Sequence, residues 1–117
     1  MDILPKKFEK SRSFIIIEII ECVPDSVVIK TIIKNFTGNI SAISIDTAEK
    51  LEEKTIPIDT FIQVIDGEAE VIIKNKSSQL KTGESIIIPA HYRHSIKANK
   101  RFKMISTIIK SGYEEVN

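Results

Sequence analysis

The amino-acid sequence predicts an all-β protein that folds as a single domain. Isoleucine is its most frequent residue, and β-branched side chains fit a pleated sheet better than a helix. The apolar residues occur in short runs separated by turn-forming residues, which is typical of β-sandwiches and barrels. No long stretch repeats its apolar residues with the helical period of about 3.6. The length of 117 residues is close to the usual size of one globular domain.

The N-terminal part of the chain contains three predicted strands, over residues 14–21, 26–34 and 40–46. Each is an apolar run bounded by polar or turn-forming residues. A short helix is expected only near residues 5–10. Residues 49–54 mix lysine and glutamate around a single leucine, and we expect them to form a solvated loop.

The next two predicted strands, residues 60–65 and 68–74, flank the dipeptide Asp66-Gly67. Asp-Gly favours a type I′ turn, because both central residues of that turn need a positive φ. We therefore predict a β-hairpin at this position. Asn75 predicts a second tight turn, since asparagine tolerates the left-handed conformation.

The C-terminal part contains the remaining predicted strands, residues 79–81, 85–89, 94–98 and 102–109. Gly83 marks a corner between the first two. Pro89 ends its strand, because proline has no amide hydrogen to donate to a neighbouring strand.

Alternation along the strands assigns residues to faces. His94 shares a face with Ile96 and Ala98, which places an imidazole on an otherwise apolar surface. Residues 60–65 carry apolar side chains on both faces, with Gln63 on the face opposite Thr60. A sheet that is wrapped into a barrel and also packed against a second subunit would cover both faces, so we expect a homodimer.

Composition and charge narrow the class of function. Lys and Arg number 17 and Asp and Glu 16, so the chain lacks the basic excess that nucleic-acid binding requires. Cys22 is the only cysteine and cannot form an internal disulfide. The longest apolar run is interrupted by Glu18 and is too short to cross a bilayer. We expect a soluble cytoplasmic domain without nucleic-acid or membrane partners.

The region from residue 54 to 110 resembles the small single-domain cupins. Gly83, Pro89 and His94 fall at the spacing of the second cupin motif, although His91 replaces its usual second glycine and Asn99 falls one position late. Residues 61–71 resemble the end of the first motif, where a strand runs into a glycine, here Gly67, and then a glutamate. The resemblance implies a double-stranded β-helix, the cupin jelly-roll barrel. We expect one domain over residues 1–117, with the barrel at 26–110 and residues 1–25 adding an edge strand or a dimer contact.

The metal-ligand positions of the family are largely lost in this sequence. Metal-binding cupins use two histidines and a carboxylate in the first motif, and these positions correspond to Lys54, Ile56 and Thr60. A related subgroup has a histidine where this chain has Ile58. Only His94, from the second motif, remains. A lone imidazole cannot retain a first-row metal ion, and the Lys54 ammonium would repel one. We therefore expect a degenerate metal site, with no metal and no other cofactor.

A pocket around His94, Thr60, Lys54, Ile56 and Ile58 is the predicted ligand-binding site. His94 can bond an anionic or hydroxylated ligand, or it can be a core histidine bonded to a carbonyl group. Lys54 can bind a carboxylate at the barrel mouth or remain a solvated charge. The two isoleucines suit an apolar ligand, or they fill the barrel themselves.

Three functions remain open on the sequence alone. The first is a cupin that binds a small, partly apolar molecule in a metal-free barrel, without assigned catalytic residues. The second is a metal-dependent oxygenase or isomerase with rearranged ligands, such as His94, His91 and a glutamate. The third is a structural or regulatory dimer with a filled barrel. We favour the first, and expect a binding protein rather than an enzyme.

Overall fold

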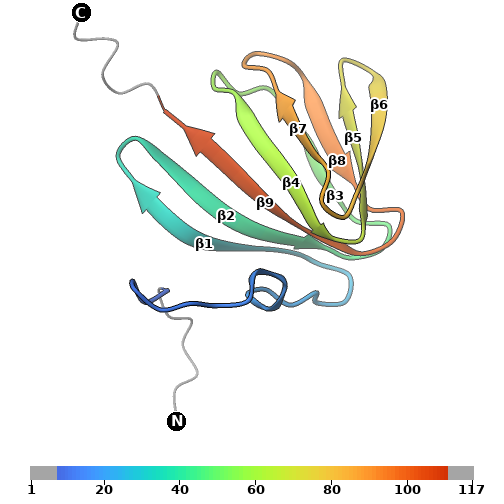
Figure 1. Ribbon diagram of the computed structural model, residues 1–117. Helices are drawn as coiled ribbons and strands as arrows, with labels where there is room; N and C mark the ends of the chain where they lie inside the picture. Colours follow the sequence, from blue (N-terminus) through green and yellow to red (C-terminus); the bar gives the residue numbers. More distant parts are fainter. Residues whose placement is uncertain (1–7, 111–117) are drawn as a thin grey trace, which may run out of the picture.

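The computed structural model describes residues 8–110 as an all-β fold (Figure 1). A single turn of 3₁₀ helix, η1 (Ile16–Glu18), precedes nine strands. These are β1 (Val27–Asn35), β2 (Gly38–Ile45), β3 (Lys50–Lys54), β4 (Thr60–Asp66), β5 (Glu68–Ile73), β6 (Lys76–Lys81), β7 (Ser85–Ile88), β8 (His94–Lys97) and β9 (Phe102–Ile109). Among the described residues, no helix is long and apolar enough to span a membrane.

The strands form two antiparallel sheets that face each other (Figure 1). The large sheet has the order β1-β2-β9-β4-β7, and the small sheet has the order β3-β8-β5-β6. The predicted all-β jelly-roll architecture is therefore confirmed. The central strand of the large sheet, β9, is the last of the strands that the structure describes, and it pairs with β2 on one side and β4 on the other.

The main core lies between the sheets and contains the inward residues of both. Alternation is clear in β4, where Thr60, Ile62 and Val64 are buried while Phe61 on the other face is exposed. The buried residues of this core are Ile43, Ile45, Ile62, Val64, Ala69, Val71, Leu80, Ile88, Ile96, Ala98, Phe102 and Met104.

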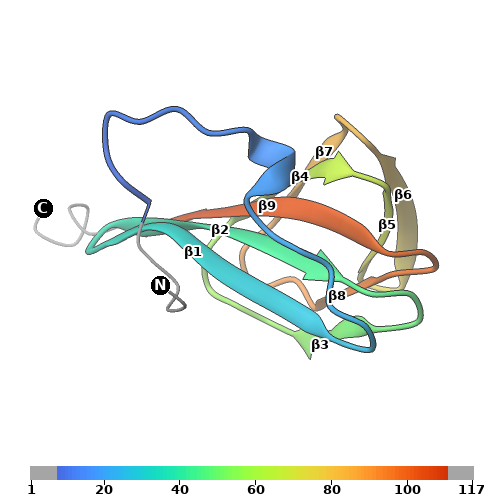
Figure 2. The ribbon, with the colours of Figure 1, turned by 90° about the horizontal axis from the view of Figure 1, so that it is seen from below.

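A second, smaller core lies on the outer face of the large sheet. Its buried members are Ile19 and Ile20 from the N-terminal segment, Ala42 from β2 and Ile105 from β9. Figure 2 shows the N-terminal segment passing over this sheet. The sequence predicts apolar side chains on both faces of residues 60–65. The N-terminal segment of the same chain covers part of the outer one of these two faces.

The predicted hairpin at Asp66-Gly67 is wrong, because β4 and β5 belong to different sheets. Gly67 has a φ of 100°, and a Cβ there would lie 2.9 Å from the Arg101 carbonyl oxygen and 2.9 Å from the Phe102 Cβ. The dipeptide therefore carries the chain from one sheet to the other across β9. Two consecutive positive φ values occur instead at Lys74 and Asn75, between the paired strands β5 and β6.

Two further predictions about strands are wrong. Residues 14–21 contain η1 and add no strand to either sheet within the described chain. Residues 50–54, predicted as a loop, form β3 at the edge of the small sheet, and charged side chains are common on such edges. Of the expected helix at 5–10, residues 5–7 lie outside the described residues, and residues 8–10 are not helical.

Candidate functional site

A small cavity of about 100 Å³ lies between the two sheets. It is closest to the end of the barrel that carries the β3–β4 and β7–β8 loops, which we call the cavity end. Its walls come from β1, β2, β3, β4, β7, β8, β9 and the β3–β4 loop. The lining residues are Ile29, Ile43, Leu51, Glu52, Lys54, Ile56, Thr60, Ile62, Ile88, His94, Ser95, Ile96, Met104, Ser106 and Ile108.

The size and the lining of the cavity restrict what it can hold. Isoleucine, leucine and methionine side chains form most of the wall. An apolar cavity of about 150 Å³ can hold benzene, so this cavity suits a group of a few non-hydrogen atoms. The barrel is neither a wide channel nor completely filled.

His94 begins β8 and is buried, as its alternation with Ile96 predicts. Its Nδ1 lies 3.2 Å from the Tyr92 carbonyl oxygen. A carbonyl oxygen can only accept, so Nδ1 carries the proton. Within the described residues Nε2 has no hydrogen-bond partner. The ring is thus oriented by the backbone and has one nitrogen unused.

Thr60 begins β4 and is buried against the cavity, with Ile88 and Ile108 as its partners in the neighbouring strands. Its Oγ1 is the one buried side-chain oxygen or nitrogen of the described residues without a hydrogen-bond partner. A buried hydroxyl left in this state is destabilising by about 1–3 kcal/mol. Thr60 and His94 therefore bring two unused polar groups to a wall that is formed mostly by apolar side chains.

Lys54 ends β3 directly beside His94, because the two residues are Cα partners in the β3–β8 pair. Its side chain is exposed and lines the cavity. Ile56 lines the cavity from the β3–β4 loop. Ile58, in the same loop, is half-buried and is not among the lining residues. The structure thus brings together four of the five residues predicted for the pocket.

Hydrogen bonds fix the β3–β4 loop against the β7–β8 loop. The His91 amide donates to the Ile56 carbonyl oxygen at 2.7 Å, and the Ala90 amide donates to Asp59 Oδ1 at 2.7 Å. His91 has a φ of 69° and an exposed side chain, so it lies on the rim. These bonds hold Ile56 over the cavity.

Several lining residues were missed by sequence reasoning. Glu52 and Leu51 lie in β3, which was predicted as a loop. Ser95 and Ser106 add hydroxyl groups, and Ser106 is the Cα partner of Ile62. The alternation of β9 could have identified Ser106, whereas no sequence signal identifies Ser95.

The cavity does not offer a set of metal ligands. Among the side chains that the structure describes, those of residues 8–52 and 54–110, there is no group of three or more His, Cys, Asp or Glu placed to hold a metal ion. At the cavity, the positions that correspond to the ligands of metal-binding cupins hold an ammonium, an isoleucine and a hydroxyl beside one imidazole. This donor set does not fit a first-row transition metal.

The cavity end is rich in positive charge. Lys34, Lys54, Lys74, Lys76, Arg93 and Lys110 lie in its loops or at the strand ends beside them. Lys74 Nζ lies 4.0 Å from the centre of the Tyr92 ring. The acidic side chains described there are Asp59 and, within the cavity wall, Glu52. The net charge of the whole chain, +1, does not reveal this local excess of positive charge.

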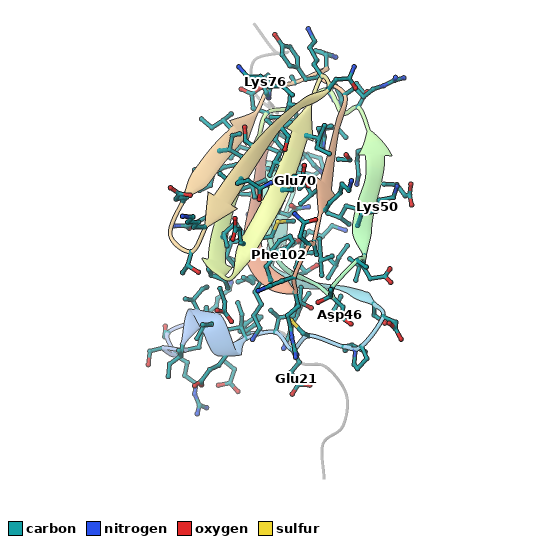
Figure 3. The ribbon with its side chains drawn as sticks, turned by 90° about the vertical axis from the view of Figure 1, so that its right-hand side faces the viewer. Glu21, Asp46, Lys50, Glu70, Lys76 and Phe102 are labelled. Atoms are coloured by element: carbon teal, nitrogen blue, oxygen red, sulfur yellow. The ribbon has the colours of Figure 1, made fainter. Side chains whose placement is uncertain are left out.

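The opposite end of the barrel carries acidic side chains, and Figure 3 shows Glu21 and Asp46 there, far from Lys76. A wide cleft of about 650 Å³ lies at this end, lined by Glu21, Cys22, Asp66, Arg101, Phe102 and Lys103. Cys22 is a free thiol. The mixture of opposite charges and the open shape give this cleft no convergent set of binding groups.

Two carboxylates outside the cavity have a lowered pKa. The pKa of Asp46 is lowered mainly by a hydrogen bond that its carboxylate accepts from the Asp25 amide at 2.7 Å. A hydrogen bond from the Thr47 amide lowers it further. The pKa of Glu70 is lowered mainly by a hydrogen bond of 2.7 Å from the Ser77 hydroxyl. Both side chains are half-buried and stabilise turns or the small sheet.

Comparison with known proteins agrees with this architecture. Residues 57–108 match the family model of the cupin domain, from the β3–β4 loop to β9. The structure is similar to a cupin-superfamily protein from Desulfitobacterium hafniense, with a TM-score of 0.84, 24% identity and coverage of 91% of this chain and 97% of that one. A conserved protein of unknown function from Streptococcus pyogenes is equally similar in structure, with a TM-score of 0.84, 20% identity and coverage of 91% and 93%.

A third similar structure is a cupin 2 conserved barrel domain protein from Leptotrichia buccalis. It has a TM-score of 0.76 and 26% identity, and the match covers 80% of this chain and 45% of that one. Comparison with curated protein sequences gives no match. The matches establish the fold of the chain and leave its ligand to be inferred from the cavity.

Proposed function

We propose that this chain, of which residues 57–108 match the model of the cupin domain and whose cavity lacks a metal-ligand set, binds a small carboxylate-bearing molecule with a short apolar body. The observation that carries this proposal is the pair of unused polar groups, Thr60 Oγ1 and His94 Nε2, on residues of a wall that is formed mostly by apolar side chains. Ligand pockets typically combine an apolar lining with a few such groups.

Each part of the site has a distinct role in this proposal. The apolar wall takes the hydrocarbon part of the ligand, and the cavity of about 100 Å³ limits that part to a few carbon atoms. Thr60 and His94 bond a polar atom of the ligand. Lys54 and the other cations of the cavity end attract its carboxylate and favour it over a neutral analogue.

The proposal describes a binding protein and assigns no reaction. The donor set of the cavity argues against a metal-dependent oxygenase or isomerase at this site. We also propose that the protein acts in the cytoplasm, consistent with its one free cysteine, Cys22. Cell fractionation with an antibody against the chain tests that location.

Titration of the isotope-labelled protein with propionate and with propionamide tests ligand binding. The two compounds have the same shape and differ in charge. For a ligand of this size we expect dissociation constants in about the millimolar range, tighter for propionate. NMR shifts should include the amides of Thr60 and His94.

Two variants locate the binding site in the same titration. Thr60→Val keeps the side-chain shape and removes the hydroxyl, and Lys54→Gln removes the charge. We expect both to weaken propionate binding, and only Lys54→Gln to reduce the preference over propionamide. Shifts confined to exposed lysines and unchanged in Thr60→Val would contradict binding in the cavity, and would favour a barrel interior that serves only as a core. About one transition metal ion per purified chain would contradict the metal-free site.

A further inference from the structure

The two buried polar residues of the cavity come from different sheets and lie at the same end of the barrel. Thr60 begins β4 in the large sheet, and His94 begins β8 in the small sheet. Both line the cavity and are only 5% and 7% exposed, respectively. The loops that precede them are joined by the hydrogen bond from the Ala90 amide to Asp59 Oδ1. The fold therefore holds these two side chains at fixed positions in the walls of one small cavity.

These two residues offer different hydrogen-bonding groups to a ligand. The Nδ1 atom of His94 donates to the Tyr92 carbonyl oxygen, so in a neutral imidazole Nε2 can only accept. The Thr60 hydroxyl has no partner in the described chain, and it can both donate and accept. A ligand group that satisfies both residues must therefore donate a hydrogen to Nε2 and also bond the Thr60 hydroxyl.

Few chemical groups meet this requirement. A hydroxyl group has one hydrogen to donate and two lone pairs to accept with, so it can bond both residues. The oxygen atoms of a carboxylate or a ketone have no hydrogen and would leave Nε2 without a partner. An ammonium group could donate, but the cations of the cavity end, Lys54 among them, would repel it. The pair therefore favours a hydroxyl group.

Lys54 adds a positive charge next to this pair. Lys54 and Leu51 are the Cα partners of His94 and Ile96, and the register of β3 shifts between them. Because directly opposed residues of an antiparallel pair share a face, Lys54 emerges on the face of His94 that lines the cavity. A carboxylate that pairs with the Lys54 ammonium group is thus close to a hydroxyl group that bonds His94. The cavity of about 100 Å³ keeps both groups on one short ligand.

We propose that the ligand of this cavity is a short hydroxycarboxylic acid. Its hydroxyl group bridges His94 Nε2 and Thr60 Oγ1, its carboxylate pairs with Lys54, and its hydrocarbon part contacts the apolar wall. The inference rests on the proposed function, which requires a carboxylate and a short apolar body, and it adds the hydroxyl group. Because contacts at three different points fix the ligand, the site distinguishes the two mirror images of such an acid.

NMR titrations at about pH 8 with L-lactate, D-lactate, propionate and pyruvate test the proposal, because imidazole groups are ordinarily neutral at this pH. The four compounds have the same number of carbon atoms and one carboxylate each. Lactate has a hydroxyl group that propionate lacks, and pyruvate has a carbonyl oxygen in its place. We expect one enantiomer of lactate to bind about 10-fold more tightly than propionate, because its hydroxyl group gives both buried residues a partner. The other enantiomer and pyruvate should show no such gain.

Three variants show whether the Thr60 hydroxyl causes the preference for lactate. Thr60→Val should remove most of the preference, and Thr60→Ser, which retains a hydroxyl group, should keep most of it. Ser44→Ala is the matched control, because it removes a buried hydroxyl that lies outside the cavity and already donates to the Glu21 carbonyl oxygen. It should leave the preference unchanged. The thermal midpoint of each variant shows that it is folded.

The outcomes separate this inference from the proposed function. Propionate that binds in the cavity as tightly as both enantiomers of lactate would overturn the inference and leave the proposed function in place. Pyruvate that binds as tightly as the better lactate would also overturn it, because donation to His94 would then contribute nothing. So would a lactate preference that Thr60→Val leaves unchanged. Failure of all four compounds to bind would overturn the proposed function and this inference together.

Discussion

The two ends of the barrel differ in how completely their polar side chains are hydrogen-bonded. At the end away from the cavity, Asp46 accepts a hydrogen bond from the Asp25 amide, Thr47 from the Arg101 amide, and Thr82 from the Gly67 amide. At the cavity end, Thr60 Oγ1 and His94 Nε2 have no partner in the described chain. The first end uses its polar groups to hold the fold, and the second keeps two of them available.

Among the substitutions that test this comparison, Gly67→Ala should cause the largest change in the free energy of unfolding. The new Cβ would meet the Arg101 carbonyl oxygen and the Phe102 Cβ at 2.9 Å, at a φ of 100°. We expect the free energy of unfolding to fall by about 2–4 kcal/mol, from backbone strain and displacement of a core residue. Urea denaturation followed by circular dichroism measures the loss.

Gly83→Ala is the control for this substitution. Gly83 has a similar φ of 90°, and nothing lies within 4 Å of the position of its Cβ. This variant should lose about 1 kcal/mol, from strain alone. Equal losses at the two glycines would show that the close approach to β9 contributes nothing.

Thr60→Val and Ser44→Ala should have effects of opposite sign. Thr60→Val removes a buried hydroxyl without a partner and should raise the free energy of unfolding by about 1 kcal/mol in the absence of ligand. Ser44 is buried, and its Oγ donates to the Glu21 carbonyl oxygen at 2.8 Å. Ser44→Ala should lower that free energy by about 1 kcal/mol. Thermal and urea denaturation of the pair measure both changes, and destabilisation by Thr60→Val would mean that its hydroxyl already has a partner.

The stability of the fold in acid should depend on Asp46. We expect this change in stability to be smaller than those at the glycines and at Thr60 and Ser44. The pKa of Asp46 is lower in the folded chain than its ordinary value, mainly because of the hydrogen bond from the Asp25 amide. The ionised carboxylate therefore stabilises the fold above about pH 4, and this contribution is lost as the pH falls through the lowered pKa. Asp46→Asn should be less stable than the original chain at neutral pH, and the difference should shrink in acid. A constant difference in denaturation curves from pH 7 to pH 3 would contradict this role.

Much of the fold could be predicted, because alternation and turn residues are local properties of the sequence. The boundaries of β9 were predicted as observed, and those of β4 nearly so. Asp66-Gly67 was misread, since the same dipeptide serves a hairpin or a passage between sheets, and only the distant Arg101 and Phe102 decide which. β3 was missed because an edge strand can be highly charged.

The candidate site, like the fold, could be predicted from the sequence only in part. His94 and Thr60 were found from alternation and from the cupin motif, and both face the cavity. Ile56 and Ile58 are two residues apart in a loop, where no periodicity tells which one reaches the interior. The unused Thr60 hydroxyl depends on the side chains of three strands and could not be read from the sequence.

The position of β9 in the large sheet has a consequence for how the chain folds during synthesis. The β1–β2 hairpin leaves the ribosome early, but its neighbour in the sheet is the last strand to be made. The Ile17 carbonyl oxygen likewise accepts its hydrogen bond from Lys103, which lies 86 residues later in the sequence. Such distant pairings slow folding and delay it until nearly the whole chain is available. A nascent chain arrested before residue 102 should therefore expose both halves of the large sheet to proteases and chaperones.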